Sequence, residues 1–172
     1  MQRIILLPIL FIFGTLTVNS QVMNQTITDP KRDKEVLIDL INRDAFILPV
    51  FGEYYQQDYA IYRPDEAIVE QIAKFSGDIS ITIVLASWCG DSREQLPRFM
   101  KILDQVGFDF SRLKMIAVDS YKLGRQQDVS SLQIERVPTF VFFRDGQEIG
   151  RIIETPRDTL EADMLEIISK SE

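Results

Sequence analysis

The sequence contains no histidine, and Cys89 is its single cysteine among 172 residues. Without an imidazole, the protein cannot use histidine as the general base of a serine or cysteine triad. One thiol is too few for an internal disulfide or for a zinc site of the four-cysteine or Cys2His2 type. These two absences exclude histidine-dependent catalysis and every metal site that needs several cysteines.

Positive charge is also scarce, with 19 lysines and arginines against 26 acidic residues and a formal net charge of −7. Since affinity for nucleic acid comes mainly from cations that neutralise phosphates, we expect no nucleic-acid partner. Asp119, Asp128, Asp145 and the acids near the C-terminus lack the spacing of a calcium loop, so we expect them on the solvated surface. Glycine-rich phosphate-binding motifs are also missing, and we expect neither a metal nor a cofactor.

Residues 1–20 have the features of a secretory signal peptide. They carry one charge, Arg3, followed by an apolar run over residues 4–13 that is shorter than the roughly 20 residues needed to span a bilayer. The small residues Val18 and Ser20 suit a signal peptidase that cleaves before Gln21. We therefore expect an exported protein, periplasmic or extracellular; an uncleaved membrane anchor is the alternative.

Residues 21–57 are interpreted as an N-terminal extension of a domain that covers residues 58–172. Residues 21–33 are polar and predict a flexible lead, whereas the i, i+4 spacing of apolar residues over 36–41 predicts a short amphipathic helix. Four tyrosines lie between residues 54 and 62. They are either a ligand platform or, as we favour, part of an aromatic core or its rim.

The remaining pattern predicts an α/β fold. Helices are expected from Arg63-Pro64-Asp65-Glu66 onward, over 89–107, and after the capping-box spacing of 155–158. Strands are expected over 79–87, 115–118, 138–143 and 148–153, the last two joined by Asp145-Gly146 in a tight hairpin. A strand-helix-strand order implies a parallel crossover. The sequence thus predicts a central mixed β-sheet flanked by α-helices, with an N-terminal helical extension.

Cys89 is the candidate nucleophile. It lies where a buried strand gives way to a helix, and the unpaired N–H groups and dipole of a helix start favour a thiolate. Ser92, three residues later, is expected on the same side of the first turn, where its hydroxyl can donate to the sulfur. Asp91 opposes the thiolate because it is a nearby carboxylate. The alternative is a buried, inert cysteine.

Several motifs together resemble those of the thioredoxin superfamily, from about residue 58 to the C-terminus. Trp88-Cys89-Gly90-Asp91-Ser92 is similar to the family's W-C-G-x-C signature, with serine in place of the second cysteine. Pro97 matches the proline that kinks the active-site helix, and Val137-Pro138-Thr139 matches the segment that contains the family's cis-proline. Gly146 falls at the familiar hairpin position. The resemblance implies a thioredoxin-like fold.

The resemblance also assigns roles to the matching residues. Cys89 is implied as the catalytic nucleophile and Ser92 as its catalytic neighbour, while Trp88 shields the thiol. The substrate chain is implied to contact Gly90, Asp91, Val137, Pro138 and Thr139. Ser92 cannot resolve a mixed disulfide, and the family's buried acid is replaced by Ile83, so both parts of the second thiol's chemistry are lost together.

We therefore predict an exported protein that performs monothiol thiol–disulfide exchange or isomerisation through Cys89. Its partners would be disulfide-containing proteins or small thiols, and an external thiol reductant would release the mixed disulfide. The alternative is a non-catalytic binding module that holds a peptide or tethers a partner through the same groove. A peroxide-reducing thiol is a weaker interpretation, because Arg93 is the only cation close to Cys89 in the sequence.

Overall fold

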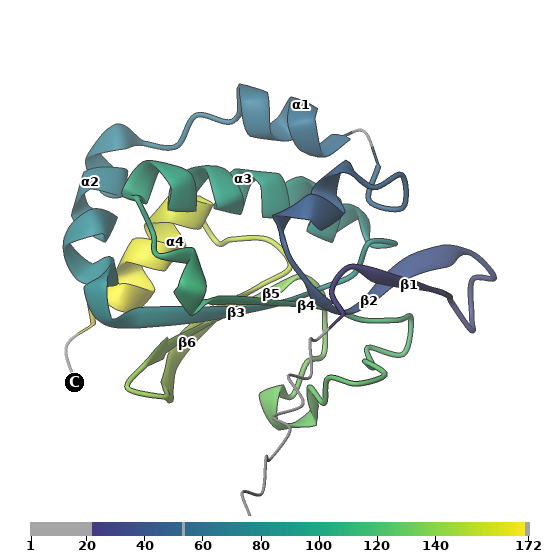
Figure 1. Ribbon diagram of the computed structural model, residues 1–172. Coiled ribbons are helices and arrows are strands. Elements are labelled where there is room, and N and C mark those ends of the chain that lie inside the picture. The colour runs from purple at the N-terminus through teal and green to yellow at the C-terminus, as the bar shows by residue number, and fades with distance from the viewer. Residues whose placement is uncertain (1–21, 53, 171–172) are drawn as a thin grey trace, which may run out of the picture.

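A six-stranded mixed sheet, in the order β1-β2-β4-β3-β5-β6, runs through the molecule (Figure 1). The computed structural model describes residues 22–52 and 54–170, so the predicted signal peptide lies outside the described residues. The strands are β1 (Gln25–Thr28), β2 (Glu35–Ile41), β3 (Ile79–Leu85), β4 (Leu113–Ala117), β5 (Thr139–Arg144) and β6 (Gln147–Ile153).

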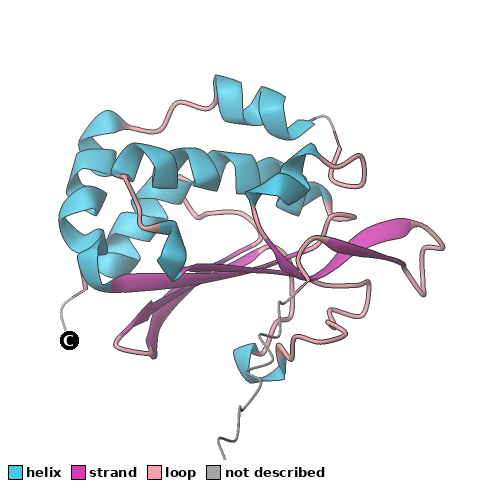
Figure 2. Cartoon of the chain, viewed as in Figure 1, coloured by secondary structure: helices cyan, strands magenta, loops and turns pink. Residues whose placement is uncertain are grey.

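The four α-helices lie on one face of this sheet, and the other face carries a loop with one short helix (Figure 2). The α-helices are α1 (Tyr54–Ile61), α2 (Glu66–Phe75), α3 (Gly90–Val106) and α4 (Leu160–Ile168). Short 3-10 helices are η1 (Arg43–Ile47), η2 (Ser76–Asp78), η3 (Phe110–Arg112) and η4 (Ser130–Leu132). Among the described residues, no helix is both long and apolar enough to cross a membrane.

The sheet has two apolar clusters, one on each face. The larger cluster fills the space between the sheet and the helices, and includes Ile83 of β3 with Leu96 and Phe99 of α3. The smaller cluster lies on the opposite face and includes Val84, Val118 and Val137, with Trp88 and Cys89 packed against it. Successive side chains of a strand point to opposite faces, which is why neighbours such as Ile83 and Val84 belong to different clusters.

The predicted connections of the central strands are confirmed. β3 and β4 are parallel and are joined through α3, while β5 and β6 are antiparallel. Asp145 and Gly146 connect β5 to β6 with φ angles of 49° and 78°, the left-handed conformation that a tight hairpin turn of this kind requires. The α/β architecture with a mixed sheet and flanking helices therefore follows the sequence pattern.

Helix boundaries agree with the sequence at two places and differ at a third. Asp65 caps α2 by accepting from the amides of Ala67 and Ile68, and Gly107 ends α3 in the left-handed region with φ 69°. The capping box expected over residues 155–158 is wrong. Thr159 is the cap instead, because its hydroxyl accepts from the amide of Ala162 and α4 begins at Leu160.

The helix and flexible lead expected in the N-terminal extension are also wrong. Residues 36–41 belong to β2, which pairs with β4 on one side and with β1 on the other, both antiparallel. The i, i+4 spacing misled because a short apolar run buried on both faces of a sheet produces the same spacing as a helix. Of the expected helical extension only η1 and the start of α1 are helical, and β2 places the extension in the central sheet.

The tyrosine-rich segment belongs to the core and its rim, as we favoured. The ring of Tyr55 stacks on Phe46 with centroids 4.3 Å apart, and both residues are buried in the larger cluster. The hydroxyl of Tyr59 donates to Asp104 and that of Tyr62 to Glu161, each at 2.6 Å. These tyrosines attach α1 and the segment after it to α3 and α4.

Candidate active site

Cys89 stands at the N-terminus of α3, directly after the loop that leaves β3, as the sequence predicted. It is the N-cap residue, with extended backbone angles of −91° and 130°, and its carbonyl accepts from the amide of Arg93. The first amides of a helix have no acceptor within the helix. Cys89 is half-buried, and its side chain makes no hydrogen bond to these N–H groups.

The thiol of Cys89 donates a hydrogen bond to the carbonyl of Val137 at 3.1 Å. The peptide bond between Val137 and Pro138 is cis, and Val137, Pro138 and Thr139 are all buried. Two segments that lie 48 residues apart in the sequence thus meet at the sulfur. The structure brings Cys89 together with the segment that the resemblance assigned to substrate binding.

Ser92 does not make the interaction expected of it. Its side chain is fully buried, and its hydroxyl accepts from the amide of Ala86 at 3.2 Å. In the part of the chain that the structure describes, it has no hydrogen bond to the sulfur of Cys89. The reason is local, because the amide of Ala86 lies where β3 ends and would otherwise be a buried donor without an acceptor.

The other predicted site residues divide between core and surface. Ile83 is fully buried in β3 and pairs with Met115 and Phe140, so the position of the family's acid is enclosed by apolar side chains. Pro97 is buried inside α3, while Gly90 is exposed and Asp91 half-exposed in its first turn. A Cβ at Gly90 would meet no atom within 4 Å outside its chain neighbours, so there is open space at this residue.

Comparison with known proteins identifies the family. The sequence model of the thioredoxin family matches residues 61–166, which include Cys89 and the Val137-Pro138-Thr139 segment. The chain belongs to the thioredoxin family.

The curated relatives are about 30% identical in sequence to this chain over the matched residues. TPR repeat-containing thioredoxin TDX of Arabidopsis thaliana is 32% identical over 90 residues, which cover 52% of this chain and only 22% of that protein. Thioredoxin of Mus musculus is 28% identical over 102 residues, 59% of this chain and 90% of the relative. A solved HIV epitope scaffold has a TM-score of 0.50 at 16% identity, covering 72% of this chain and 84% of that one. This last likeness concerns the thioredoxin-like fold alone.

Trp88 of this thioredoxin domain is fixed from two sides. Its indole N–H donates to the carbonyl of Val118 at 3.1 Å. The guanidinium of Arg32, from the turn between β1 and β2, lies over its ring at 4.4 Å from the centroid. A second hydrogen bond, from Nε of Arg32 to the hydroxyl of Ser120 at 3.0 Å, fixes the position of the guanidinium. Arg32 and Ser120 are site residues that the sequence analysis missed.

Asp29 holds this arrangement together from the start of the turn. Its carboxylate is buried and accepts from the amides of Lys31 and Arg32 and from both the amide and the hydroxyl of Ser120. Burial alone would raise the pKa of Asp29, but these hydrogen bonds outweigh it and lower the pKa below its usual value. A local signal did exist, because Asp29-Pro30 is typical of a turn, but nothing in the sequence indicated what the turn contacts.

Arg93 is committed to structure, although it is the cation nearest to Cys89 in the sequence. Its guanidinium donates to the carbonyl of Ser87 at 2.7 Å and to that of Val50 at 3.4 Å. The buried hydroxyl of Ser87 in turn accepts from the amide of Leu37 in β2. These contacts connect the loop before Cys89 to the N-terminal extension. Arg32, which lies over Trp88, is a second cation near this loop.

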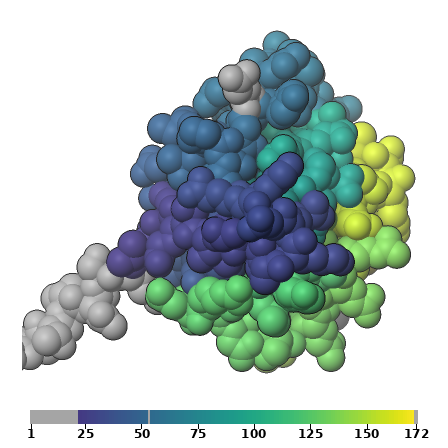
Figure 3. Space-filling model, turned by 90° about the vertical axis from the view of Figure 1, so that its right-hand side faces the viewer, coloured from purple at the N-terminus to yellow at the C-terminus, as the bar shows by residue number. Residues whose placement is uncertain are grey.

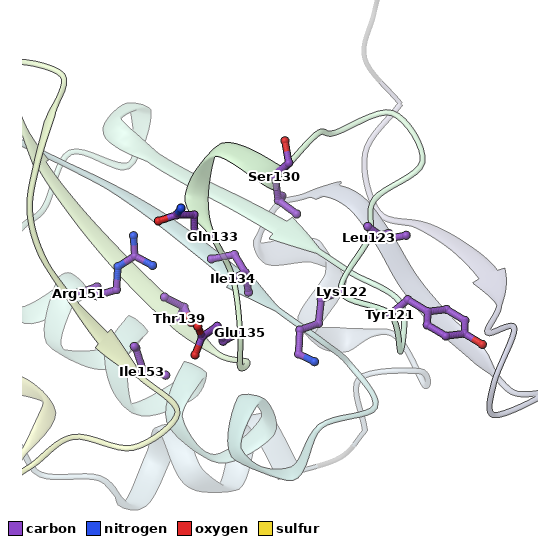
Figure 4. A pocket seen from close by; sticks show the side chains of 11 residues that line it. Tyr121, Lys122, Leu123, Ser130, Gln133, Ile134, Glu135, Thr139, Arg151 and Ile153 are labelled. Atoms are coloured by element: carbon purple, nitrogen blue, oxygen red, sulfur yellow. The ribbon is translucent and has the colours of Figure 1, made fainter.

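A groove of about 670 Å³ adjoins the site on the face of the sheet that lacks α-helices (Figure 4). Thr139 and Ile153, from β5 and β6, form one wall, and Lys122 of the loop that follows β4 contributes to the opposite wall. Ile134 lines the groove and also packs against the apolar cluster that contacts Cys89. The groove therefore begins one residue from the cis-proline.

The acidic residues do not form a metal centre. Within residues 22–52 and 54–170, no group of three or more Cys, Asp or Glu side chains is arranged to hold a metal ion. The expectation that the acids are solvated is wrong for Asp119, Glu161 and Asp163, which are all buried. Each accepts hydrogen bonds from backbone amides, Asp119 from Tyr121 and Leu123 for example, which explains how the carboxylates are accommodated.

Proposed function

We propose that this thioredoxin domain performs monothiol thiol–disulfide exchange, with Cys89 as its nucleophile. One observation carries the proposal: half-buried Cys89 begins a helix and its sulfur contacts Val137, while the hydroxyl of Ser92 is bound to the amide of Ala86. The nucleophile and the neighbouring backbone segment are in place. A resolving group is missing, because serine has no sulfur to attack a disulfide.

The reaction conserves atoms and electrons as follows. The Cys89 thiolate attacks one sulfur of a partner disulfide, a new S–S bond forms, and the partner's second sulfur leaves as a thiolate that takes up a proton. An external thiolate then attacks the mixed disulfide and releases the first partner sulfur. A second external thiol frees Cys89, so the two external thiols are oxidised to a disulfide as the partner disulfide is reduced.

Catalysis of disulfide reduction by an external thiol tests this function. The wild-type chain should accelerate reduction of a protein disulfide such as that of insulin, and Cys89→Ser should abolish the acceleration. Ser111→Ala, which alters an exposed hydroxyl in η3, is the matched control and should retain full activity. Equal rates for wild type and Cys89→Ser would contradict the proposal.

The alternative, a binding module, has one observation in its favour. The thiol of Cys89 donates to the carbonyl of Val137, so the sulfur already has a partner within the protein. A module of this kind would bind its peptide equally well as the reduced wild-type protein and as the Cys89→Ser variant. If an immobilised peptide disulfide is retained by both forms with equal affinity and is never reduced, the binding function is correct.

We also propose that the protein is exported. The support is the single charge, the short apolar run and the small residues at positions 18 and 20 of the sequence. The intact mass of protein recovered from outside the cytoplasm tests this. A chain that begins at Gln21 is expected, and one that retains Met1 would contradict cleavage.

A further inference from the structure

Arg32 is a fixed cation over the ring of Trp88, the residue before the proposed nucleophile. Its Nε donates to Ser120 and its plane lies over Trp88, the residue that precedes Cys89. A guanidinium has five N–H donors, and these contacts use only one of them. Within the described residues, the two terminal nitrogens of Arg32 make no ion pair and no hydrogen bond. Four donors are therefore available at the edge of the active site.

The position of Arg32 is built into the fold. The buried carboxylate of Asp29 accepts from the consecutive amides of Lys31 and Arg32 and from Ser120, which is itself the partner of Arg32. This network joins the β1–β2 hairpin to the loop after β4, and Figure 3 shows these two segments packed together on one face. The side chain of Arg32 is thus already ordered before a ligand binds, so binding costs little further side-chain entropy.

In a chain with a formal charge of −7, residues 29–35 carry three cations, Lys31, Arg32 and Lys34, which balance the three acids of the same segment. Asp29 is used by the turn itself, and the neighbouring Asp33 is exposed. A planar guanidinium with its terminal nitrogens free matches a carboxylate, to which it can donate two parallel hydrogen bonds.

We propose that Arg32 binds a carboxylate of the disulfide-bearing partner next to Cys89, and that it therefore determines which disulfides react fastest. This inference rests on the proposed function, because it concerns the partner of the same exchange reaction. The carboxylate belongs either to an acidic side chain near a cysteine of a protein or to a small thiol that carries its own carboxylates. Both supply the same chemistry to the guanidinium.

The test compares an anionic with a neutral disulfide reagent. Rate constants for Cys89 are measured with dithiobis(nitrobenzoate), which carries carboxylates, and with dithiodipyridine, which does not. Arg32→Gln should lower the ratio of the anionic to the neutral rate by about three- to fivefold, as expected for one partly exposed ion pair. A change in thiol reactivity alone would alter both rates equally and leave their ratio unchanged.

Lys34→Gln is the matched control, because it removes the same charge from the same turn at an exposed residue. It should leave the ratio unchanged. Equal effects of the two variants, or an unchanged ratio in Arg32→Gln, would overturn the proposal while leaving the exchange function intact. Failure of both reagents to react with wild type would instead contradict the exchange function. Fluorescence of Trp88, the sole tryptophan, verifies that each variant is folded.

Two pairs of substrates identify the source of the carboxylate and need no variant that risks misfolding. One pair is a peptide disulfide with Asp or Asn beside its cysteine, and the other is glutathione disulfide or its ethyl ester. A faster reaction of the wild-type protein with the acidic peptide indicates a protein partner, and a faster reaction with free glutathione disulfide indicates a small thiol. Equal rates within both pairs would overturn the proposal.

Discussion

Ser92 is a structural residue at the place where a dithiol thioredoxin has its second cysteine. Its hydroxyl satisfies the buried amide of Ala86, so Ser92→Ala leaves that donor without a partner. We expect a loss of about 1–3 kcal/mol in the free energy of unfolding, measured by urea denaturation. Alkylation of Cys89 by iodoacetamide should keep its wild-type rate, and a large change in that rate would show that Ser92 acts on the sulfur after all.

We propose that Ile83 and Ser92 together account for the absence of dithiol chemistry. Ser92→Cys should permit release of a mixed disulfide without external thiol, but slowly, because the apolar surroundings of Ile83 offer no carboxylate to take the second thiol's proton. Adding Ile83→Asp should increase reduction of insulin disulfides further, at a cost in stability from burying an acid. Equal activity of the single and double variants, both shown to be folded, would contradict this pairing of the two positions.

At the scale of elements, β2 is joined to the loop after β4 by one buried carboxylate. Asp39 has a positive φ of 63°, and its Oδ1 accepts from the amides of Arg125, Gln126 and Gln127 at 2.8–2.9 Å. The loop approaches so closely at Gly124 that a Cβ there would lie 2.8 Å from the same oxygen. The hairpin and this loop therefore form one structural unit beside the active site.

Gly124→Ala tests that close approach. The added methyl group clashes with Asp39 and with the backbone of Gln127, so the free energy of unfolding should fall by about 1–3 kcal/mol. Gly77→Ala is the control, because a Cβ at Gly77 meets no atom within 4 Å, and it should be neutral or slightly stabilising. Equal stabilities of the two variants in urea denaturation would show that the loop does not pack against Asp39 as described.

Asp104 joins η1, α1 and α3, and makes stability depend on pH. It accepts from both terminal nitrogens of Arg43 and from Tyr59 at 2.6–2.7 Å. Burial would raise its pKa, but these hydrogen bonds outweigh burial and lower the pKa below the usual value. A lowered pKa in the folded state stabilises the protein above the unfolded pKa of about 3.9, and this contribution is lost as the pH falls through the folded value.

Asp104→Asn should accordingly lower the free energy of unfolding by about 1–2 kcal/mol at neutral pH. The difference from wild type should shrink as the pH falls below about 4, where Asp104 is protonated in the unfolded chain, and should disappear below the lowered pKa of the folded protein. Asp158→Asn, at an exposed carboxylate, should have little effect at any pH. A difference that stayed constant down to pH 2 would contradict the role of the Asp104 charge.

At the scale of the whole molecule, the sequence predicted what local patterns determine. The apolar run of β3, the helix that begins after Cys89 and the Asp145-Gly146 turn all depend on neighbours in the sequence, and all three were correct. The apolar spacing of residues 36–41 predicts a helix, but these residues belong to strand β2. Only the pairing of β2 with β4 distinguishes a strand from a helix here.

Long-range contacts explain what was missed at the site. Arg32 reaches Ser120 across 88 positions of the sequence and Asp29 reaches it across 91, so no local pattern could associate them with Cys89. Ser92 was placed on the correct turn of the helix, but the direction of its hydroxyl depends on a backbone amide that β3 leaves unpaired. Motifs thus indicated the proposed nucleophile, whereas the residues that surround it could be found only from the fold.

We propose that Cys89 acts without a second thiol of this chain, and the rate at which its mixed disulfide is released tests this. The wild-type chain, joined through Cys89 to a peptide thiol, is mixed with increasing concentrations of an external thiol, and release is followed by intact mass. Because Ser92 cannot attack the mixed disulfide, the release rate should rise linearly with thiol concentration and extrapolate to zero without it. Release at an appreciable rate in the absence of external thiol would contradict the account.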